Sequence, residues 1–371
     1  MHKAPFRFDI VGSFLRPDYL KQARENYKLG NISKEELTVI EDRAIRDLVQ
    51  KQKTVGLPVI TDGEFRRSWW HLDFMWGLNG VKKVEISEGY KFHNETTRAE
   101  TARLTGKISG ENHPFVEHFK FVKALEDENT TARQTIPAPA QFLAELKRAD
   151  NIATTKAIYP NEDELIADIA KAYQQVIADL YKAGCRNVQF DDCTWGMFCD
   201  TKYWQARQQN AASIEDLAKQ YLTVNNLAIK GKPADLALTT HVCRSNYHST
   251  WAAQGGYAPI APYLFAQENV DAYYLEFDDE RSGDFEPLKY VNGDKKVVLG
   301  LITTKNPKLE NKDAIIERIK QATKYLPLDR LCLSPQCGFA STEEGNKLTE
   351  EEQWLKLNLV KEIANVVWHS I

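Results

Sequence analysis

The stretch NEDELIADIAKAYQQVIADLYKAGCRNVQFDD, residues 161–192, contains both units of the fold that the sequence predicts. Its first part has apolar residues at helical spacing, acids in the first turn and Gly184 after the last, which predicts an amphipathic helix. Its last part, RNVQFDD, is a short apolar run that ends in two carboxylates and is typical of a buried strand. A helix that leads directly into such a strand is the unit of folds with a parallel sheet.

The same alternation extends outward in both directions. Further apolar runs rich in Val, Ile, Leu, Phe and Tyr predict strands at residues 8–14, 57–65, 133–140, 236–243, 272–279, 296–304 and 330–335. Apolar spacing predicts helices at residues 34–56, 213–231, 312–327 and 350–370. Strands that alternate with helices in this number predict an α/β fold, a (β/α)8 TIM barrel. A doubly wound open sheet is the alternative, but no GxGxxG motif follows any of the strands.

Residues 66–130 do not fit a single connecting helix. The segments KFHN, TARLTGKISG and VEHFKFVKAL partly alternate apolar and polar residues, which indicates strands. We therefore predict one catalytic barrel over residues 1–371, with a β-rich excursion at 66–130 between strands two and three. This insertion could be a small subdomain or a lid.

Composition excludes several classes of partner. The chain is 43% hydrophobic and 27% charged with a formal net charge of -4, an ordinary globular balance without a basic block for nucleic acid. No apolar run is long enough to cross a membrane, and the first residues lack the apolar core of a signal peptide. We therefore expect a cytoplasmic protein with neither nucleic acid nor membrane as a partner. Its six cysteines, without a CxxC pair, suit free thiols or metal ligands better than disulfides.

Four residues near the ends of predicted strands suit a zinc ion: His241, Cys243, Glu276 and Cys337. In a barrel of this type the active site lies at the carboxyl ends of the strands. Zinc binds Cys sulfur, His nitrogen and carboxylate oxygen, usually with four ligands. Positions i and i+2 of a strand face the same side, so His241 and Cys243 can face one ion together. The alternatives are an ion pair of Glu276 with Arg281 and a buried, unliganded thiol at Cys337.

Six short elements in this order resemble the C-terminal catalytic barrel of cobalamin-independent methionine synthase. The elements H-x-C, Glu before Arg-Ser and P-x-C-G correspond to residues 241–243, Glu276 with 281–282, and 335–338. The elements I-G-S-F, G-E-F-x-R and Q-x-D-E correspond to residues 11–14, 63–67 and 189–192. The elements span nearly the whole chain, and their common order makes the resemblance specific.

The resemblance implies a methyltransferase of methionine biosynthesis with Zn²⁺ as cofactor, held by the four residues named above. It also implies that homocysteine is bound through its amino and carboxylate groups by Ser13, Glu64 and Asp191. The homocysteine thiol would be activated as a zinc-bound thiolate and methylated to methionine, with no further catalytic residue. A zinc thiol alkyltransferase for another thiol and a non-catalytic zinc scaffold are the competing interpretations.

The methyl donor is the least determined part of this prediction. Full-length members carry an additional N-terminal barrel, and we expect this chain to be a short, single-barrel relative without it. The family's folate region contains a Trp that residues 135–143 lack, and Asp192-Cys193 stands where the family has Glu-Pro. Methyltetrahydrofolate is the expected donor, with a methylated corrinoid protein or a small methyl compound as alternatives. Four residues are candidates for the donor site: Arg66, Trp69, Trp70 and Lys305. Their alternative roles are packing for the tryptophans, a salt bridge for Arg66 and a solvated surface position for Lys305.

Overall fold

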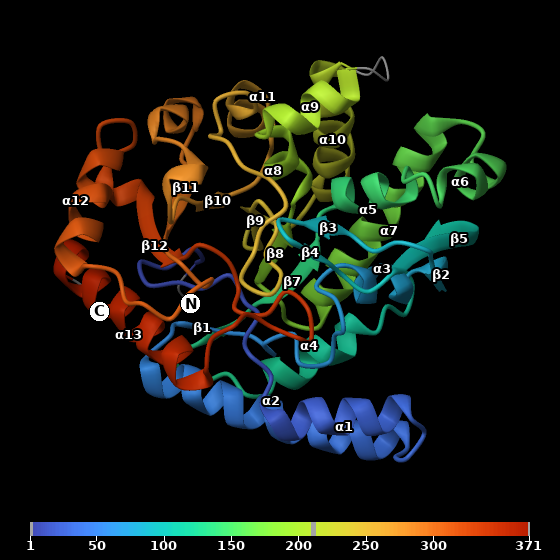
Figure 1. Cartoon of the computed structure of the whole chain (residues 1–371), viewed down its shortest axis with the longest axis horizontal. Coiled ribbons are helices and arrows are strands. Elements are labelled where there is room, and N and C mark those ends of the chain that lie inside the picture. The colour runs from blue at the N-terminus through green and yellow to red at the C-terminus, as the bar shows by residue number, and fades with distance from the viewer. Residues whose placement is uncertain (1–2, 209–212, 370–371) are drawn as a thin grey trace.

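A six-stranded parallel sheet forms the centre of the computed structural model, which describes residues 3–208 and 213–369 (Figure 1). The strands lie in the order β12-β11-β10-β9-β8-β7. Their bounds are β7 Gln134–Pro137, β8 Asn187–Asp191, β9 Ala237–Val242, β10 Ala272–Glu276, β11 Lys296–Ile302 and β12 Leu331–Pro335. All residues of β7 to β10 are buried, as expected for parallel strands with both faces covered. The α/β fold with a parallel sheet is thus confirmed.

Two further strands and one extended segment lie beside this sheet. Strands β1, Val59–Ile60, and β6, Thr131–Ala132, form a parallel pair, and β6 is separated from β7 by Arg133 alone. The segment predicted as the first strand, residues 8–14, makes isolated parallel bridges instead of a ladder. These bridges join Phe8 to Leu333 of β12, and Ser13 to Gly63 after β1.

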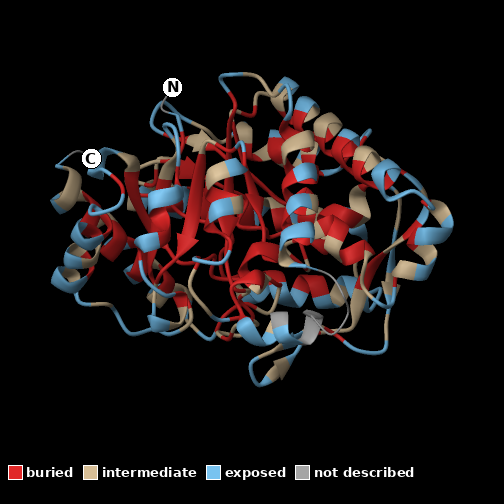
Figure 2. Cartoon of the chain, turned by 90° about the horizontal axis from the view of Figure 1, so that it is seen from above, coloured by how far each residue is buried: buried red, intermediate tan, exposed pale blue. Residues whose placement is uncertain are grey.

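The helices are mostly arranged around the sheet, and the longer ones bury one apolar face (Figures 1 and 2). They are α1 Asp18–Lys28, α2 Lys34–Val55, α5 Pro139–Leu146, α6 Ile152–Ile158, α7 Glu162–Lys182, α8 Thr194–Phe198, α9 Thr201–Gln208, α10 Ile214–Ile229, α11 Ala261–Gln267, α12 Lys312–Ala322 and α13 Glu350–Trp368. Short 3₁₀ turns occupy Glu280–Ser282, Glu286–Tyr290 and Leu328–Arg330. The helices predicted from apolar spacing are confirmed within a few residues, and residue 370 lies outside the described range. Within that range, no helix has the length and apolar character needed to cross a membrane.

Local signals account for the ends of the long helices. Ser33 and Glu36 form a reciprocal capping box at the start of α2, and Gly56 ends that helix with a φ of 86°. Asn161 begins α7 by accepting a hydrogen bond from the backbone of Asp163.

The segment 66–130 contains two antiparallel strand pairs and two helices. Strands β2, Asn79–Glu85, and β5, Glu100–Ser109, form the longer pair, and β3, Lys91–Phe92, pairs with β4, Glu95–Thr96. Helix α3 is Leu72–Gly77 and helix α4 is Phe115–Lys123. The interpretation of VEHFKFVKAL as strand-like is wrong, because Phe115, Phe119 and Val122 recur at helical spacing and are buried on one face of α4. Whether the segment acts as a lid stays a prediction.

A buried ion pair links the extended segment to the sheet. Arg133 Nη2 lies 2.9 Å from Asp9 Oδ1, and both side chains have no exposed surface. The Tyr274 hydroxyl of β10 donates to Asp9 at 2.8 Å, and Arg133 donates to the backbone carbonyl of Ile10 at 2.6 Å. These contacts join the start of the chain, the residue between β6 and β7, and β10 through the interior.

Replacing Arg133 with Leu should lower the free energy of unfolding by about 3–5 kcal/mol, because Asp9 would remain buried without a counter-charge. Tyr274→Phe is the matched control, since it removes one hydroxyl from the same network and should cost about 1–2 kcal/mol. Denaturant titration followed by circular dichroism measures both values. Equal costs for the two variants would contradict a structural role of the ion pair.

Candidate functional site

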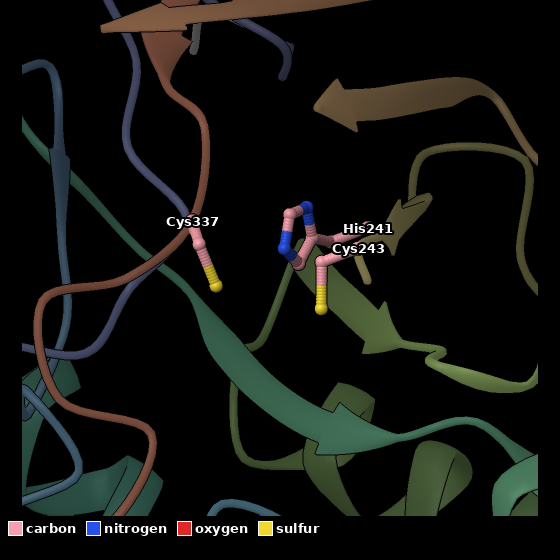
Figure 3. A group of neighbouring side chains, drawn as sticks. All are labelled: His241, Cys243 and Cys337. Carbon is pink, nitrogen blue, oxygen red and sulfur yellow. The ribbon is translucent and has the colours of Figure 1, made fainter. Parts of the chain in front are cut away.

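Three of the four predicted metal ligands lie together at the carboxyl ends of the strands. The ligand atoms of His241, Cys243 and Cys337 all lie within 4.8 Å of one another, and all three residues are buried. His241 lies near the end of β9, Cys243 follows that strand, and Cys337 follows β12 (Figure 3). The i, i+2 spacing places His241 and Cys243 on the same side, while Val242 packs into the main hydrophobic core.

The His241 ring is oriented for metal binding. Its Nδ1 lies 3.2 Å from the backbone oxygen of Tyr274, and a carbonyl there requires the proton on Nδ1. Its Nε2 is buried without a hydrogen-bond partner among the described residues. A ligand histidine usually has this arrangement, because the outer hydrogen bond fixes the ring and leaves the other nitrogen free for the ion.

The two thiols are also in a setting that favours a cation. A hydrogen bond with the Cys193 thiol, together with burial, raises the pKa of Cys243 well above its usual range. The hydrogen bond with Cys243 and burial raise the pKa of Cys337 in the same way. A bound dication reverses this effect and holds such thiols as thiolates. The donor set of one imidazole and two cysteines therefore fits zinc.

The fourth predicted ligand, Glu276, forms ion pairs outside this group of atoms. Its carboxylate lies 2.7 Å from the Arg281 guanidinium and 3.4 Å from Lys305 Nζ, and it accepts from the Arg244 backbone N–H at 2.8 Å. Burial alone would raise the pKa of Glu276, but Lys305 and Arg281 lower it to about 2. The ion pair with Arg281 that the sequence offered as the alternative is present. Metal binding by Glu276 stays a prediction.

The predicted substrate residues line a small cavity beside the metal-ligand group. Its volume is about 20 Å³, and its walls include Ser13, Glu64, Asp191, His241, Cys243 and Cys337. These side chains come from the segment 8–14, the turn after β1, the end of β8, the end of β9 and the loop after β12. The structure therefore brings the proposed thiol-binding and amine-binding residues into one enclosure.

Glu64 and Asp191 form a buried acidic pair at this cavity. Glu64 Oε1 accepts from the Thr135 hydroxyl at 2.9 Å and pairs with Arg67 at 3.0 Å, while Oε2 has no partner within the described part of the chain. Burial, and then the charge of Glu64, raise the pKa of Asp191 well above its usual range. Burial likewise raises the pKa of Glu64. A cationic group of a ligand would relieve both effects.

A second cavity of about 410 Å³ adjoins the first. The two share Trp70, Cys193, Asn246 and Ser341 as lining residues. The larger cavity has an aromatic wall formed by Trp69, Trp70, His71, Tyr90, Phe92 and Tyr247. Its volume lies in the range of small-molecule sites, and its flat side chains suit a planar ligand.

The four predicted donor-site residues divide into two groups. Trp69 and Trp70 line the larger cavity. Arg66 instead pairs with Glu41 and Asp42 of α2 at 3.3 and 2.5 Å. Lys305 is buried and pairs with Asp278 at 2.7 Å. Donor binding by these residues stays a prediction.

Several cavity residues were missed by the sequence reasoning. Cys193 is one, although its position directly after the carboxylates of predicted strand four could have indicated it. The others form a chain in which His71 Nε2 lies 3.1 Å from the Tyr90 hydroxyl, which donates to Glu145 at 2.8 Å. Burial lowers the pKa of His71 to about 3, so its ring is neutral near pH 7. Tyr90 belongs to the segment 66–130, and no sequence signal placed it here.

The matches of this chain to a family model, to known proteins and to solved structures agree with one another. The family model described as "Cobalamin-independent synthase, Catalytic domain" matches residues 8–365. The chain is 45% identical over 368 residues to the uncharacterized protein YxjH of Bacillus subtilis (strain 168), covering 99% of this chain and 96% of that protein. It is 25% identical to the methionine synthase of Saccharolobus solfataricus, covering 92% and 94%. The crystal structure of a putative vitamin-B12 independent methionine synthase from Listeria monocytogenes superimposes with a TM-score of 0.78 at 39% identity, covering 99% of both chains.

A buried polar network supports the end of β8 beneath the site. Asn225 donates through one amide nitrogen to Asp192 at 3.1 Å and to Glu268 at 2.9 Å. Glu268 is fully buried, and burial together with the charge of Asp192 raises its pKa to about 8. The folded protein therefore binds a proton at Glu268 that the unfolded chain releases at lower pH.

The stability of the protein should fall as pH rises from about 5 to about 8, because the raised pKa of Glu268 favours its protonated form in the folded state. The Glu268→Gln variant has no ionisable group at this position, so its free energy of unfolding should change less with pH. If the two proteins are compared with their values at pH 5 as the reference, the variant should be about 1–4 kcal/mol more stable than the wild type at pH 8. Unfolding titrations across this range measure the difference. Glu317→Gln, at an exposed position of α12, is the control and should follow the wild type. If the free energy of unfolding of Glu268→Gln changes with pH as that of the wild type does, the raised pKa of Glu268 is wrong.

Proposed function

The chain belongs to the cobalamin-independent methionine synthase family, and we propose that it is a zinc-dependent methyltransferase that converts homocysteine to methionine. Methyl transfer to homocysteine is the activity that this family membership supports. The proposal rests on one observation. The ligand atoms of His241, Cys243 and Cys337 form a group that lines the same cavity as Glu64 and Asp191.

We also propose that the strands close into a (β/α)8 barrel. The support comes from the segment 8–14, whose backbone bonds to β12 and to the turn after β1. Asp9 N donates to Leu333 O at 3.0 Å, and Phe14 N donates to Gly63 O at 3.1 Å. The segment thus connects the two edges of the strand arrangement.

His241, Cys243 and Cys337 would hold the zinc ion. Zinc supplies the positive charge that keeps a substrate thiol in its nucleophilic, deprotonated form near neutral pH. Glu276 is the fourth ligand that the sequence predicts, and it would have to exchange its contacts with Arg281 and Lys305 for the metal.

Glu64 and Asp191 would bind the ammonium group of homocysteine. Glu64 Oε2, which has no partner in the part of the chain that the structure describes, is available for such a contact, and an ammonium ion would compensate both carboxylates. Ser13 would contribute to the carboxylate end, since its hydroxyl lies at the same cavity, 3.4 Å from the backbone nitrogen of Ala340. Two anchoring points on the amino acid fix the direction of its thiol toward the metal-ligand group.

The larger cavity would bind the methyl donor. Its aromatic walls support a flat donor, and we propose methyltetrahydrofolate, with the pterin ring beside Trp69 and Trp70. A methylated corrinoid protein or another small methyl compound is the alternative donor. A screen of these donors with homocysteine, measuring methionine formed, distinguishes them.

A related zinc enzyme that alkylates a different thiol is the second candidate function. A thiol with a sulfonate group would require cationic residues at the anchoring point, whereas this cavity presents Glu64 and Asp191. The acidic pair therefore favours a thiol that carries an amine.

Purified protein should contain about one zinc ion per chain, and Cys243→Ser and Cys337→Ser should both lose it, since each removes one of the few protein ligands of the ion. Elemental analysis measures the zinc content. Cys332→Ser is the matched control, because Cys332 is equally buried in β12 but lies outside the ligand group. Zinc retained in both ligand variants would show that the ligand assignment is wrong.

Glu64→Gln and Asp191→Asn should each weaken homocysteine binding about 10–100-fold, because each removes a charge that faces the ammonium group. Calorimetric titration of the zinc-loaded proteins measures the affinity. The control ligand is 4-mercaptobutyrate, which is homocysteine without its amine. The variants should bind this analogue as well as the wild type does. If the variants lose affinity equally for both ligands, the substitutions act on thiol binding or on the fold and not on the contact with the amine.

A further inference from the structure

A third cysteine lies at the candidate metal centre. Cys193 Sγ is 3.3 Å from Cys243 Sγ, and Cys193, Cys243 and Cys337 form a separate buried cluster against Trp70. We propose that Cys193 is a metal ligand and that the substrate-free site binds its ion through three thiolates and His241. This inference rests on the zinc site of the proposed function, but not on the identity of its thiol substrate.

The backbone holds Cys193 at this position. The residue before it, Asp192, donates its backbone N–H to the carbonyl of His241 at 2.8 Å. The short helix α8 that follows packs directly on the chain at Cys243, where a Cβ on Gly196 would lie 1.8 Å from the Cys243 carbonyl oxygen. A residue with any side chain cannot occupy position 196 without moving this contact. The approach of Cys193 to Cys243 is therefore a consequence of the main chain.

The sulfur positions suit a shared ion. Two sulfurs on one tetrahedral zinc, each about 2.3 Å from the metal, lie about 3.8 Å apart. The thiols of Cys193 and Cys243 are free and about 0.5 Å closer than this distance. Cys193 lies outside the group of ligand atoms within 4.8 Å of one another, so its side chain has to turn toward His241 and Cys337 to share the ion. His241 Nε2, which has no hydrogen-bond partner among the described residues, supplies the nitrogen for the same ion.

The competing fourth ligand, Glu276, is held away by its own partners. Its carboxylate contacts Arg281 and Lys305, whose side chains are only 7% and 8% exposed. Moving the carboxylate to the metal would take it from two nearly buried cations and from the backbone N–H of Arg244. Binding by Cys193 requires a side-chain rotation but breaks no ion pair. The ion pairs of Glu276 therefore favour sulfur over oxygen at the fourth position.

Cys193 also lies where the two cavities meet, since it lines both. A substrate sulfur that accepts a methyl group from the larger cavity must face the same junction. We therefore infer that the substrate thiol takes the place of Cys193. In this exchange Cys193 would leave the ion as the substrate sulfur binds, and Cys193 would accept the thiol proton of the substrate. The number of thiolates on the ion stays the same.

The first test counts sulfur ligands without substrate. X-ray absorption of the zinc-loaded wild type should show three sulfur neighbours per zinc. In cobalt-substituted protein, Cys193→Ser should lower the sulfur-to-metal charge-transfer absorbance per bound cobalt by about one third. Cys199→Ser is the matched control, because this buried cysteine contacts the Trp195 carbonyl oxygen and lies outside the ligand group, so the absorbance should not change.

Two sulfur neighbours in the wild type, or unchanged absorbance in Cys193→Ser, would overturn the proposal even if the protein methylates homocysteine. Three neighbours without any homocysteine binding would support it and overturn the proposed function instead. The second test adds homocysteine to both proteins. The wild type should keep three sulfur neighbours, and Cys193→Ser should rise from two to three. A rise to four in the wild type would overturn the exchange.

Discussion

The site depends on one electrostatic constraint, the compensation of charge in a nearly closed space. Thiols, a histidine nitrogen and two carboxylates line a cavity of about 20 Å³ and are all buried, which limits the screening of charge by water. Thiol hydrogen bonds, together with burial, raise the pKa values of Cys243 and Cys337, and burial raises the pKa of the Asp191 carboxyl. These groups carry negative charge near neutral pH only when cations are bound beside them. A metal ion and an ammonium group satisfy the two halves of this requirement.

The carboxylates near the site fall into two kinds, and the difference indicates where a ligand binds. Glu276 is fully paired by Arg281, Lys305 and the backbone of Arg244. Within residues 3–208 and 213–369, Glu64 keeps one oxygen without a partner, and Asp191 receives a hydrogen bond from Gln189 at 3.2 Å. The protein supplies two cations to Glu276, whereas at Glu64 it supplies Arg67 to one oxygen only, which leaves the other oxygen and Asp191 available to a cationic ligand.

The sequence predicts the elements whose signals are local. Period-two and helical spacing identify the strands and the long helices, and the i, i+2 rule places His241 beside Cys243. The strands also bring Cys337 to that pair, because parallel strands end at one edge. The prediction is weaker for the segment 8–14, which makes single bridges where a ladder was expected, and for residues 115–123, which are helical. Short apolar runs do not distinguish a strand from a helix.

Local sequence signals do not predict which partners the long charged side chains contact. Arg66 follows a site residue in the sequence, yet its guanidinium reaches Glu41 and Asp42 on α2. Lys305 ends a strand near the site, yet it pairs with Asp278. These partners are set by tertiary packing, which also brings Tyr90 from the segment 66–130 into the larger cavity. The position of Cys193, by contrast, is set by the main chain. It follows from the end of β8 and from the close packing at Gly196. Residues fixed by the main chain can therefore be located from strand order, whereas those that reach the site through long side chains require the folded structure.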